Sequence, residues 1–198
     1  VHVVGRVEVV AALGVLADTL NHHDEARAHY QRALSIRTAR LSKDHPDVAR
    51  SLNGLGNIEV SAGNYVEAER LYTEALALRE RAYGPSHPIV AGSLNNLSLV
   101  YRRDGRFDEA RDVLQRAILL TETAHGLRHP ALARPLTNLA IAERLAGRLD
   151  EAERHARRGL DIRREANGEE HVELADSLGE LGRIAAARGD RSAAITLL

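Results

Sequence analysis

The stretch from His45 to Gly84 reads HPDVARSLNGLGNIEVSAGNYVEAERLYTEALALRERAYG, and its pattern returns along the chain at a fixed step of 42 residues. The opening dipeptide His45-Pro46 recurs as His87-Pro88 and His129-Pro130, and then as His171-Val172, where the proline is lost. Sequences that repeat every ~20 to 50 residues are typical of solenoids, in which each repeat buries its apolar face on its neighbours. The repetition therefore predicts a protein that presents a long surface and not a reactive pocket.

The first half of each repeat has the pattern of an amphipathic helix. Counted from the His of His-Pro, the eighth and eleventh positions are apolar (Leu52 and Leu55 in the quoted stretch), and the twelfth is small in every repeat. The nineteenth position is Gly63, followed at later repeats by Gly105, Gly147 and Gly189, and it is Asn21 in the first repeat. Glycine, and then asparagine, is preferred where a helix ends in a left-handed conformation. The first helix is therefore predicted to end at this position in every repeat.

The second half of the repeat predicts another helix. Its first turn carries an acidic residue, Glu67 in the quoted stretch, where the helix dipole favours negative charge. Small residues follow at Ala68 and, seven residues later, at Ala75, which allows two helix backbones to approach closely. Glycines at 84, 126 and 168 then end this helix before the next His-Pro position. Each repeat is therefore predicted to be an antiparallel helix pair.

These residues resemble a known repeat. The pattern Leu-x-x-Leu-Gly/Ala, then Gly-x-Tyr/Phe-x-x-Ala, then Ala-Leu is similar to the tetratricopeptide repeat. The stretch from His45 to Gly84 resembles its long, 42-residue form, typified by kinesin light chains and many bacterial kinesin-light-chain-like proteins. The resemblance implies an all-α, right-handed α-solenoid of nine or ten helices, with the first helix of each repeat on the concave side. It divides one array, residues 1–198, into repeats 3–44, 45–86, 87–128, 129–170 and 171–198.

Three departures from this pattern carry expectations of their own. Pro135 falls six residues after His129, where it removes a hydrogen bond and is expected to kink or delay the first helix of its repeat. The first repeat lacks His-Pro, and the last stops within its second helix. Since the chain has no methionine and stops inside a helical pattern, we expect it to be a fragment of a larger protein. The exposed final repeat is expected either to fray after Gly189 or to self-associate.

Composition argues against several classes of function. The 27 basic and 28 acidic residues nearly cancel, so no overall field would recruit nucleic acid or a membrane. No apolar run approaches the ~20 residues of a membrane span, and the absence of cysteine removes thiolate catalysis and thiolate metal sites. A cluster of arginines (Arg154, Arg157, Arg158, Arg163 and Arg164) is interspersed with acidic residues and is expected to form a solvated outer helix face. The composition is consistent with a cytoplasmic protein.

The ten histidines and the paired glycines do not predict chemistry. The His-Pro histidines occupy equivalent positions in repeats about 8–10 Å apart, whereas zinc holds nitrogen ligands at about 2.0–2.1 Å. We therefore expect these histidines to make a cap or loop contact at the start of the first helix, and we expect no metal and no cofactor. The pair Gly54-x-Gly56 lies inside a predicted helix without a third glycine in register, which indicates packing and not nucleotide binding. No catalytic constellation is found, so the chain is not expected to be an enzyme.

The resemblance does imply a binding surface. In tetratricopeptide arrays the first helices line a concave groove, and the ligand-facing positions map to the sixth, ninth, tenth, thirteenth, sixteenth and seventeenth residues of the repeat. The candidate groove residues are Arg50, Asn53, Asn57, Asn95, Asn96, Leu99, Arg102, Arg103, Arg134, Asn138, Ile141, Arg144 and Arg183. Asparagine is a poor helix former, so its repeated use in mid-helix predicts a role, and its carboxamide can both donate to and accept from a peptide backbone.

These residues predict a protein-interaction module that binds an extended acidic peptide, since arginine pairs well with carboxylates. The peptide would come from a partner protein or from another domain of the parent chain. Two alternatives remain open at the level of sequence. The polar positions could be merely solvated, or the array could be the sensor or regulatory arm of a larger bacterial signalling ATPase, protease or transcription regulator.

Overall fold

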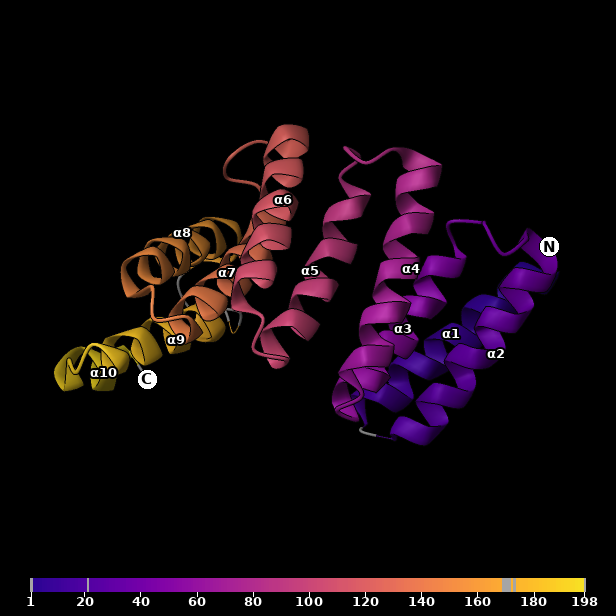
Figure 1. Ribbon diagram of the computed structural model, residues 1–198, viewed down its shortest axis with the longest axis horizontal. Helices are drawn as coiled ribbons and strands as arrows, with labels where there is room; N and C mark the ends of the chain where they lie inside the picture. The colour runs from indigo at the N-terminus through magenta and orange to yellow at the C-terminus, as the bar shows by residue number, and fades with distance from the viewer. Residues whose placement is uncertain (1, 21, 169–171, 173, 198) are drawn as a thin grey trace. The chain divides into compact units, whose positions relative to one another are not determined.

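The computed structural model describes the chain except for residues 1, 21, 169–171, 173 and 198, and it describes residues 2–6 and 197 by their backbone alone. The described residues form ten α-helices and one short 3-10 helix (Figure 1). The helices are α1 (His2–Thr19), α2 (His23–Leu41), α3 (Val48–Ser61), α4 (Tyr65–Tyr83), α5 (Ile89–Arg103), α6 (Phe107–His125), α7 (Ala133–Leu145), α8 (Leu149–Asn167), α9 (Leu174–Ala187) and α10 (Arg191–Leu197). The 3-10 helix η1 (Pro130–Leu132) precedes α7.

The chain consists of two compact halves, residues 1–100 and 101–198. Within the N-terminal half, α1 packs against α2, α3 against α4, and α2 against α3. The C-terminal half repeats this scheme, with α7 against α8, α9 against α10, and both α6 and α8 against the first helix of the repeat that follows. The predicted all-α architecture of tandem helix pairs is therefore confirmed.

Glycine ends the helices where the sequence predicts. Gly63 follows α3 with φ +79° and Gly84 follows α4 with φ +89°, values at which any other residue would be strained. The equivalent glycines of later repeats share this conformation. The predicted helix end at Asn21 and the repeat boundary at His171 lie outside the described residues.

The histidines of the His-Pro positions make side-chain hydrogen bonds just before or at the start of the first helices, in agreement with the expected cap or loop contact. The Nδ1 atoms of His45, His87 and His129 each accept a hydrogen bond, at 3.2 Å, from the backbone N–H two residues further along. Such a bond satisfies one of the unpaired N–H groups at a helix start. It also requires an unprotonated Nδ1.

Pro135 delays its helix, as predicted. In its repeat, η1 comes first and α7 begins at Ala133, the fifth position, whereas α3 begins at Val48, the fourth. Pro135 then falls in the first turn of α7, where its missing N–H would have had no partner within the helix.

The core of each half lies between the paired helices, and in the N-terminal half it includes a close approach of glycine to tyrosine. A Cβ atom at Gly54 would lie 2.4 Å from Cε1 of Tyr30, and one at Gly56 would lie 2.5 Å from Cε1 of Tyr72. Both rings are buried. The interpretation of this glycine pair as a packing feature is therefore confirmed.

Candidate functional site

An arginine joins the second helix of one repeat to the first helix of the next; Arg37 and Arg163 are buried, and Arg79 is half-buried. Nη1 of Arg37 donates to Oγ of Ser51 at 2.6 Å, and Nη1 of Arg79 donates to Oγ of Ser93 at 2.6 Å. Arg163 donates to Ser177 in the same way in the C-terminal half. In each pair the serine follows the arginine by 14 residues. This Arg–Ser contact is thus part of the repeat, and it places a guanidinium group beneath the first helices.

One junction departs from this rule at both partners. Thr121 stands where the other second helices carry arginine, and Pro135 stands where the other first helices carry serine. The hydroxyl of Thr121 donates to the carbonyl of Ala117 at 2.8 Å, within its own helix. A proline offers no side-chain acceptor, so an arginine at residue 121 would lack the hydroxyl that its counterparts use.

The N-terminal half contains a pocket of about 500 Å³ beside these arginines. Three of the predicted groove residues line it, namely Arg50, Asn53 and Asn57. The second helices contribute Arg37 and Arg79, and the remaining lining residues are Glu8, Ala11, Ala12, Val15, Tyr30 and Gly54. Arg37 and Arg79 were not among the predicted groove residues, although their fixed spacing to serine is visible in the sequence.

The charges in this N-terminal pocket are unevenly paired. The carboxylate of Glu8 accepts from Arg37 at 3.0 Å and lies 3.2 Å from a guanidinium nitrogen of Arg50. Arg37, which is only 2% exposed, therefore has an ionic partner. Arg79 has the hydroxyl of Ser93 as its hydrogen-bond acceptor, and burial above all lowers its pKa. The like charge of Arg50 acts in the same direction on that pKa.

The two asparagines of the N-terminal pocket differ in their contacts. Asn57 is exposed, and its Oδ1 accepts from the hydroxyl of Tyr72 at 2.6 Å. Asn53 is 8% exposed, and its Oδ1 has no hydrogen-bond partner among the residues that the structure describes. A buried acceptor without a donor costs free energy, which a bound donor would recover.

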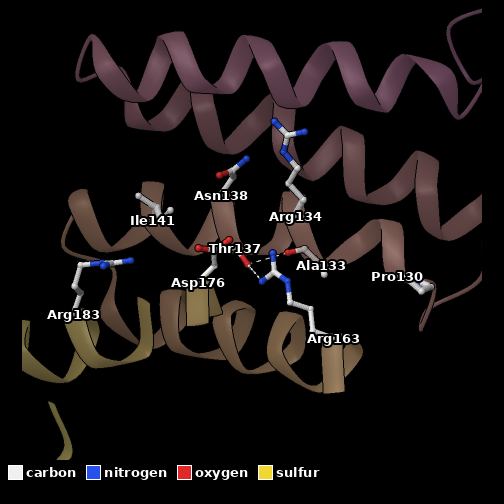
Figure 2. Close-up of a pocket in the computed structure, with 9 residues that line it drawn as sticks. All are labelled: Pro130, Ala133, Arg134, Thr137, Asn138, Ile141, Arg163, Asp176 and Arg183. Carbon is white, nitrogen blue, oxygen red and sulfur yellow. Dashed lines mark hydrogen bonds between the residues drawn. The ribbon is translucent and has the colours of Figure 1, made fainter. Parts of the chain in front are cut away.

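The C-terminal half contains a second pocket, of about 480 Å³ (Figure 2). Four predicted groove residues line it, namely Arg134, Asn138, Ile141 and Arg183. The other lining residues are Pro130, Ala133, Thr137, Arg163 and Asp176. Arg163 donates to the hydroxyl of Thr137 at 2.9 Å from beneath α7. With an exposure of 8%, Arg163 does not belong to a solvated outer face, and that prediction was wrong for this residue.

Glu180 holds two of the predicted arginines in place. Its carboxylate is fully buried and accepts from Arg144 at 2.6 Å and from Arg183 at 2.8 Å. Arg102 also interacts electrostatically with Glu180. Burial and then the like charge of Arg103 lower the pKa of Arg102, whereas the negative charge of Glu180 raises it. Arg144 and Arg183 are therefore partly committed to an internal carboxylate.

The remaining predicted residues do not line either of these two pockets. Asn95 is 5% exposed and is thus not an open carboxamide on a groove surface. Asn96 and Leu99 on α5 are half-buried, and Arg103 is exposed. The assignment of these asparagines to a peptide-binding groove stays a prediction, and the structure places Asn95 inside the helix layer.

No group of three or more His, Asp or Glu side chains in the described part of the chain is arranged to hold a metal ion. None of the helices searched is long and apolar enough to cross a lipid bilayer.

Tandem helix pairs that display polar pockets beside their first helices define a helical-repeat scaffold. The profile of the tetratricopeptide repeat family matches residues 9–81, 52–118, 90–165 and 132–198. The chain therefore belongs to the tetratricopeptide repeat family, whose members are protein–protein interaction scaffolds. No curated protein matches the sequence significantly.

Several solved structures share the fold. The BtubC (BKLC) structure from P. vanneervenii has a TM-score of 0.81 and 23% identity over 99% of this chain and 78% of that chain. The TPR-like repeats ascribed to a kinesin light chain of Podospora anserina have a TM-score of 0.77 and 23% identity over 97% and 91%. PilW, a type IV pilus biogenesis factor, has a TM-score of 0.69 and 22% identity over 96% and 74%. The similarity to kinesin-light-chain-like repeats predicted from the sequence is confirmed at the level of fold.

Proposed function

We propose that this protein captures an extended, net-acidic peptide, using the pocket of each half as a separate contact. The observation that carries this proposal is the surplus of arginine over carboxylate among the pocket-lining residues. Arg37, Arg50 and Arg79 face one carboxylate, Glu8, in the N-terminal pocket. The C-terminal pocket is similar, with three arginines and one aspartate among its lining residues. Guanidinium groups form strong, paired hydrogen bonds with carboxylates.

The proposal takes residues 1–198 as one array and places it in the cytoplasm, where it acts by binding and not by catalysis. The peptide belongs to a partner protein or to another part of the parent chain. Asn138 and Ile141 would contact the peptide backbone and an apolar side chain, respectively, because a carboxamide can both donate and accept. Affinity is then expected to fall as ionic strength rises, since exposed charge pairs are screened by salt.

A peptide array followed by affinity measurement tests the proposal. We expect acidic linear sequences to bind in preference to neutral or basic ones. The best peptide should then bind Arg134→Glu about tenfold or more weakly, because the change removes a charged contact and adds repulsion. Arg154→Glu provides a matched control, since Arg154 is exposed on α8 and lines neither pocket. Preferential binding of neutral peptides, or equal losses in both variants, would contradict the proposal.

A further inference from the structure

A further cleft of the N-terminal half lies between its two second helices, α2 and α4, and has a volume of about 620 Å³. It shares no lining residue with the N-terminal pocket described above. Its walls are neutral polar residues of α2 on one side (Gln31, Ser35 and Thr38) and charged residues of α4 on the other (Glu67, Arg70 and Glu74). We call this space the second-helix cleft. Its volume is within the range of about 300–1,000 Å³ that is typical of ligand sites.

The C-terminal half bridges the equivalent junction with an arginine of its own. Arg158 on α8 stands two repeats after Glu74, and Glu122 on α6 stands two repeats after Thr38. Nη1 of Arg158 lies 2.6 Å from the carboxylate of Glu122, and Nη2 donates to the backbone carbonyl of Leu127 at 2.8 Å. One guanidinium thus connects α8 to α6 and to the loop that follows α6.

The last junction of the chain is closed by a second arginine. Arg188 follows α9 and pairs with both Asp150 and Glu153 of α8. The cleft beside α8 and α10 has a volume of only about 140 Å³. Three repeats earlier, Ala62 stands in the position of Arg188, and alanine cannot form such a pair. The second-helix cleft is thus the larger of the two and lacks both bridging arginines.

The walls of the second-helix cleft keep their polar contacts within their own helices. The hydroxyl of Thr38 donates to the carbonyl of Leu34 at 2.8 Å. Glu74 accepts from Arg70 at 3.1 Å, and the same guanidinium donates to Glu67 at 2.7 Å. Both carboxylates are exposed and share this one guanidinium. The α4 wall therefore attracts a further cation.

Two other charged residues line the cleft. Glu59 pairs with Arg27 at 3.0 Å and is thereby neutralised. Lys43, the one lysine of the chain, lies in the loop after α2 and makes no ion pair with the residues that the structure describes. Its flexible ammonium group would compete with a ligand cation for Glu74, so that removing its charge should strengthen the binding of such a ligand.

The floor of the second-helix cleft is apolar. It is formed by Leu52 and Leu55 of α3, Leu71 of α4 and the partly buried Leu34 of α2. Two repeats after Leu71 the chain has His155, which lies 2.7 Å from a carboxylate oxygen of Glu143. Because leucine replaces this polar side chain in the N-terminal half, the floor favours an apolar group of a ligand.

We propose that the second-helix cleft binds a peptide segment in which an arginine lies next to an apolar side chain. The arginine takes the place that Arg158 holds in the C-terminal half, between the carboxylate of Glu74 and the backbone carbonyl of Lys43. The apolar side chain lies on Leu34 and Leu71. Arginine suits the site better than lysine, because its planar guanidinium donates in two directions at once. This site goes beyond the proposed function, since its ligand has the opposite charge and it shares no residue with either pocket.

Nuclear magnetic resonance on the full chain with 13C-labelled leucine methyl groups tests the site directly. Four probes are titrated: acetyl-Ala-Leu-Arg-Leu-Ala-amide, the same peptide with lysine or with glutamine in place of arginine, and acetyl-Ala-Ala-Arg-Ala-Ala-amide. We expect the first peptide to shift the methyl resonances of Leu34 and Leu71. The lysine peptide should bind more weakly, and the glutamine peptide about tenfold or more weakly, because it lacks the charged contact. The peptide without leucine should also bind more weakly.

Substitutions that reproduce the C-terminal half provide the sharpest test. Thr38→Glu combined with Glu74→Arg supplies the pair that Glu122 and Arg158 form, and it should abolish binding of the arginine peptide without lowering the unfolding temperature.

Three single variants complete the test. Glu74→Gln should weaken binding of the arginine peptide by about fivefold or more, and Lys43→Gln should strengthen it. Asp24→Asn is the matched control, because Asp24 is exposed on α2 and does not line the cleft. Circular dichroism confirms that each variant is folded.

The outcomes separate this inference from the proposed function. If the arginine peptide leaves Leu34 and Leu71 unshifted at millimolar concentration, or binds folded Glu74→Gln as tightly as the unmodified chain, the inference is wrong. Equal binding of the glutamine peptide would overturn the role of the cation, and equal binding of the lysine peptide would overturn the role of the guanidinium. Weaker binding by Lys43→Gln would also contradict the charge assignment. None of these results bears on acidic peptides, whose binding is measured through Arg134→Glu.

Discussion

At the scale of single residues, the serine-bonded arginines of the second helices are the most informative side chains. Arg37 has both an acidic partner and a serine acceptor, whereas Arg79 has only the serine. Removing one member of a buried ion pair leaves the other group without its partner, and this costs more than removing an arginine that has no ionic partner. The two residues should therefore differ in their contribution to stability although the repeat makes them equivalent.

We predict that Arg37→Met lowers the free energy of unfolding by about 1 to 3 kcal/mol, because Ser51 loses its arginine donor and Glu8 keeps only its contact with Arg50. Arg79→Met should change it by less than about 1 kcal/mol, because no carboxylate loses a partner. Urea unfolding followed by circular dichroism gives both values. Equal destabilisation by the two substitutions would show that Arg79 has a stabilising partner after all.

The sequence predicted part of the candidate site. Periodicity and family resemblance identified Arg50, Asn53 and Asn57 in one pocket, together with four residues of the other. They could not show that Asn95 is buried, because the same residue type at a neighbouring position, Asn96, remains half-exposed. Arg37 and Arg79 were missed because the resemblance directed attention to the first helices, and Arg163 was assigned to an outer face, although the Arg–Ser spacing of 14 residues was present in the sequence.

At the scale of helices, close packing of the pairs depends on residues without a side chain. Gly56 on α3 faces the ring of Tyr72 on α4, which is fully buried. Helix ends were predictable because glycine with a positive φ is a local requirement, as at Gly63. The tyrosine contact was not predictable residue by residue, because it depends on how two helices are rotated about their axes.

Gly56→Ala is predicted to destabilise the protein by about 1 to 3 kcal/mol, the usual cost of overpacking a core. Its added methyl group would lie 2.5 Å from Tyr72, a distance that forces the ring or the helix to move. Gly92→Ala is the matched control on α5, since its Cβ would meet no atom closer than 3.8 Å. The control should be neutral or stabilising, because alanine favours a helix interior. Thermal unfolding of both variants makes the comparison, and a stable Gly56→Ala protein would contradict the packing argument.

At the scale of the whole molecule, a nearly neutral chain exposes apolar side chains on its first helix. Leu13 and Leu16 of α1 and Leu20, which follows it, are 42%, 55% and 57% exposed. Their counterparts Leu55 and Ile58 in the next repeat are 7% and 0% exposed, because α2 packs against α3. Ile195 on α10 is also exposed, at 79%, whereas Ala194 is buried. Contiguous apolar surface of this kind favours association.

We predict that the 198-residue chain associates as its concentration rises, with α1 as the main contact. Light scattering across a concentration series should show a rising mean mass, and Leu16→Gln combined with Leu20→Gln should abolish the rise. Ile195→Gln tests the contact through the C-terminal repeat, which the sequence analysis predicted. If only this second variant restores a monomer, association runs through α10. A constant monomeric mass for the unmodified chain would exclude both contacts.

Thr121 and Pro135 stand where the other repeats have an arginine and its serine partner, and this double replacement limits how the gene of a repeat protein can recombine. Each Arg–Ser contact spans the boundary between two repeats, so a recombination event that cuts at a His-Pro codon separates the partners. At the boundary between repeats 87–128 and 129–170, such an event would place an arginine opposite Pro135. Alternatively, it would place Thr121 opposite a serine that lacks its arginine donor. The segment that keeps both partners of each contact together therefore begins in the middle of one second helix and extends beyond the start of the next first helix. Chimaeras joined within the second helix, before residue 121, should express and fold better than chimaeras joined at residue 129.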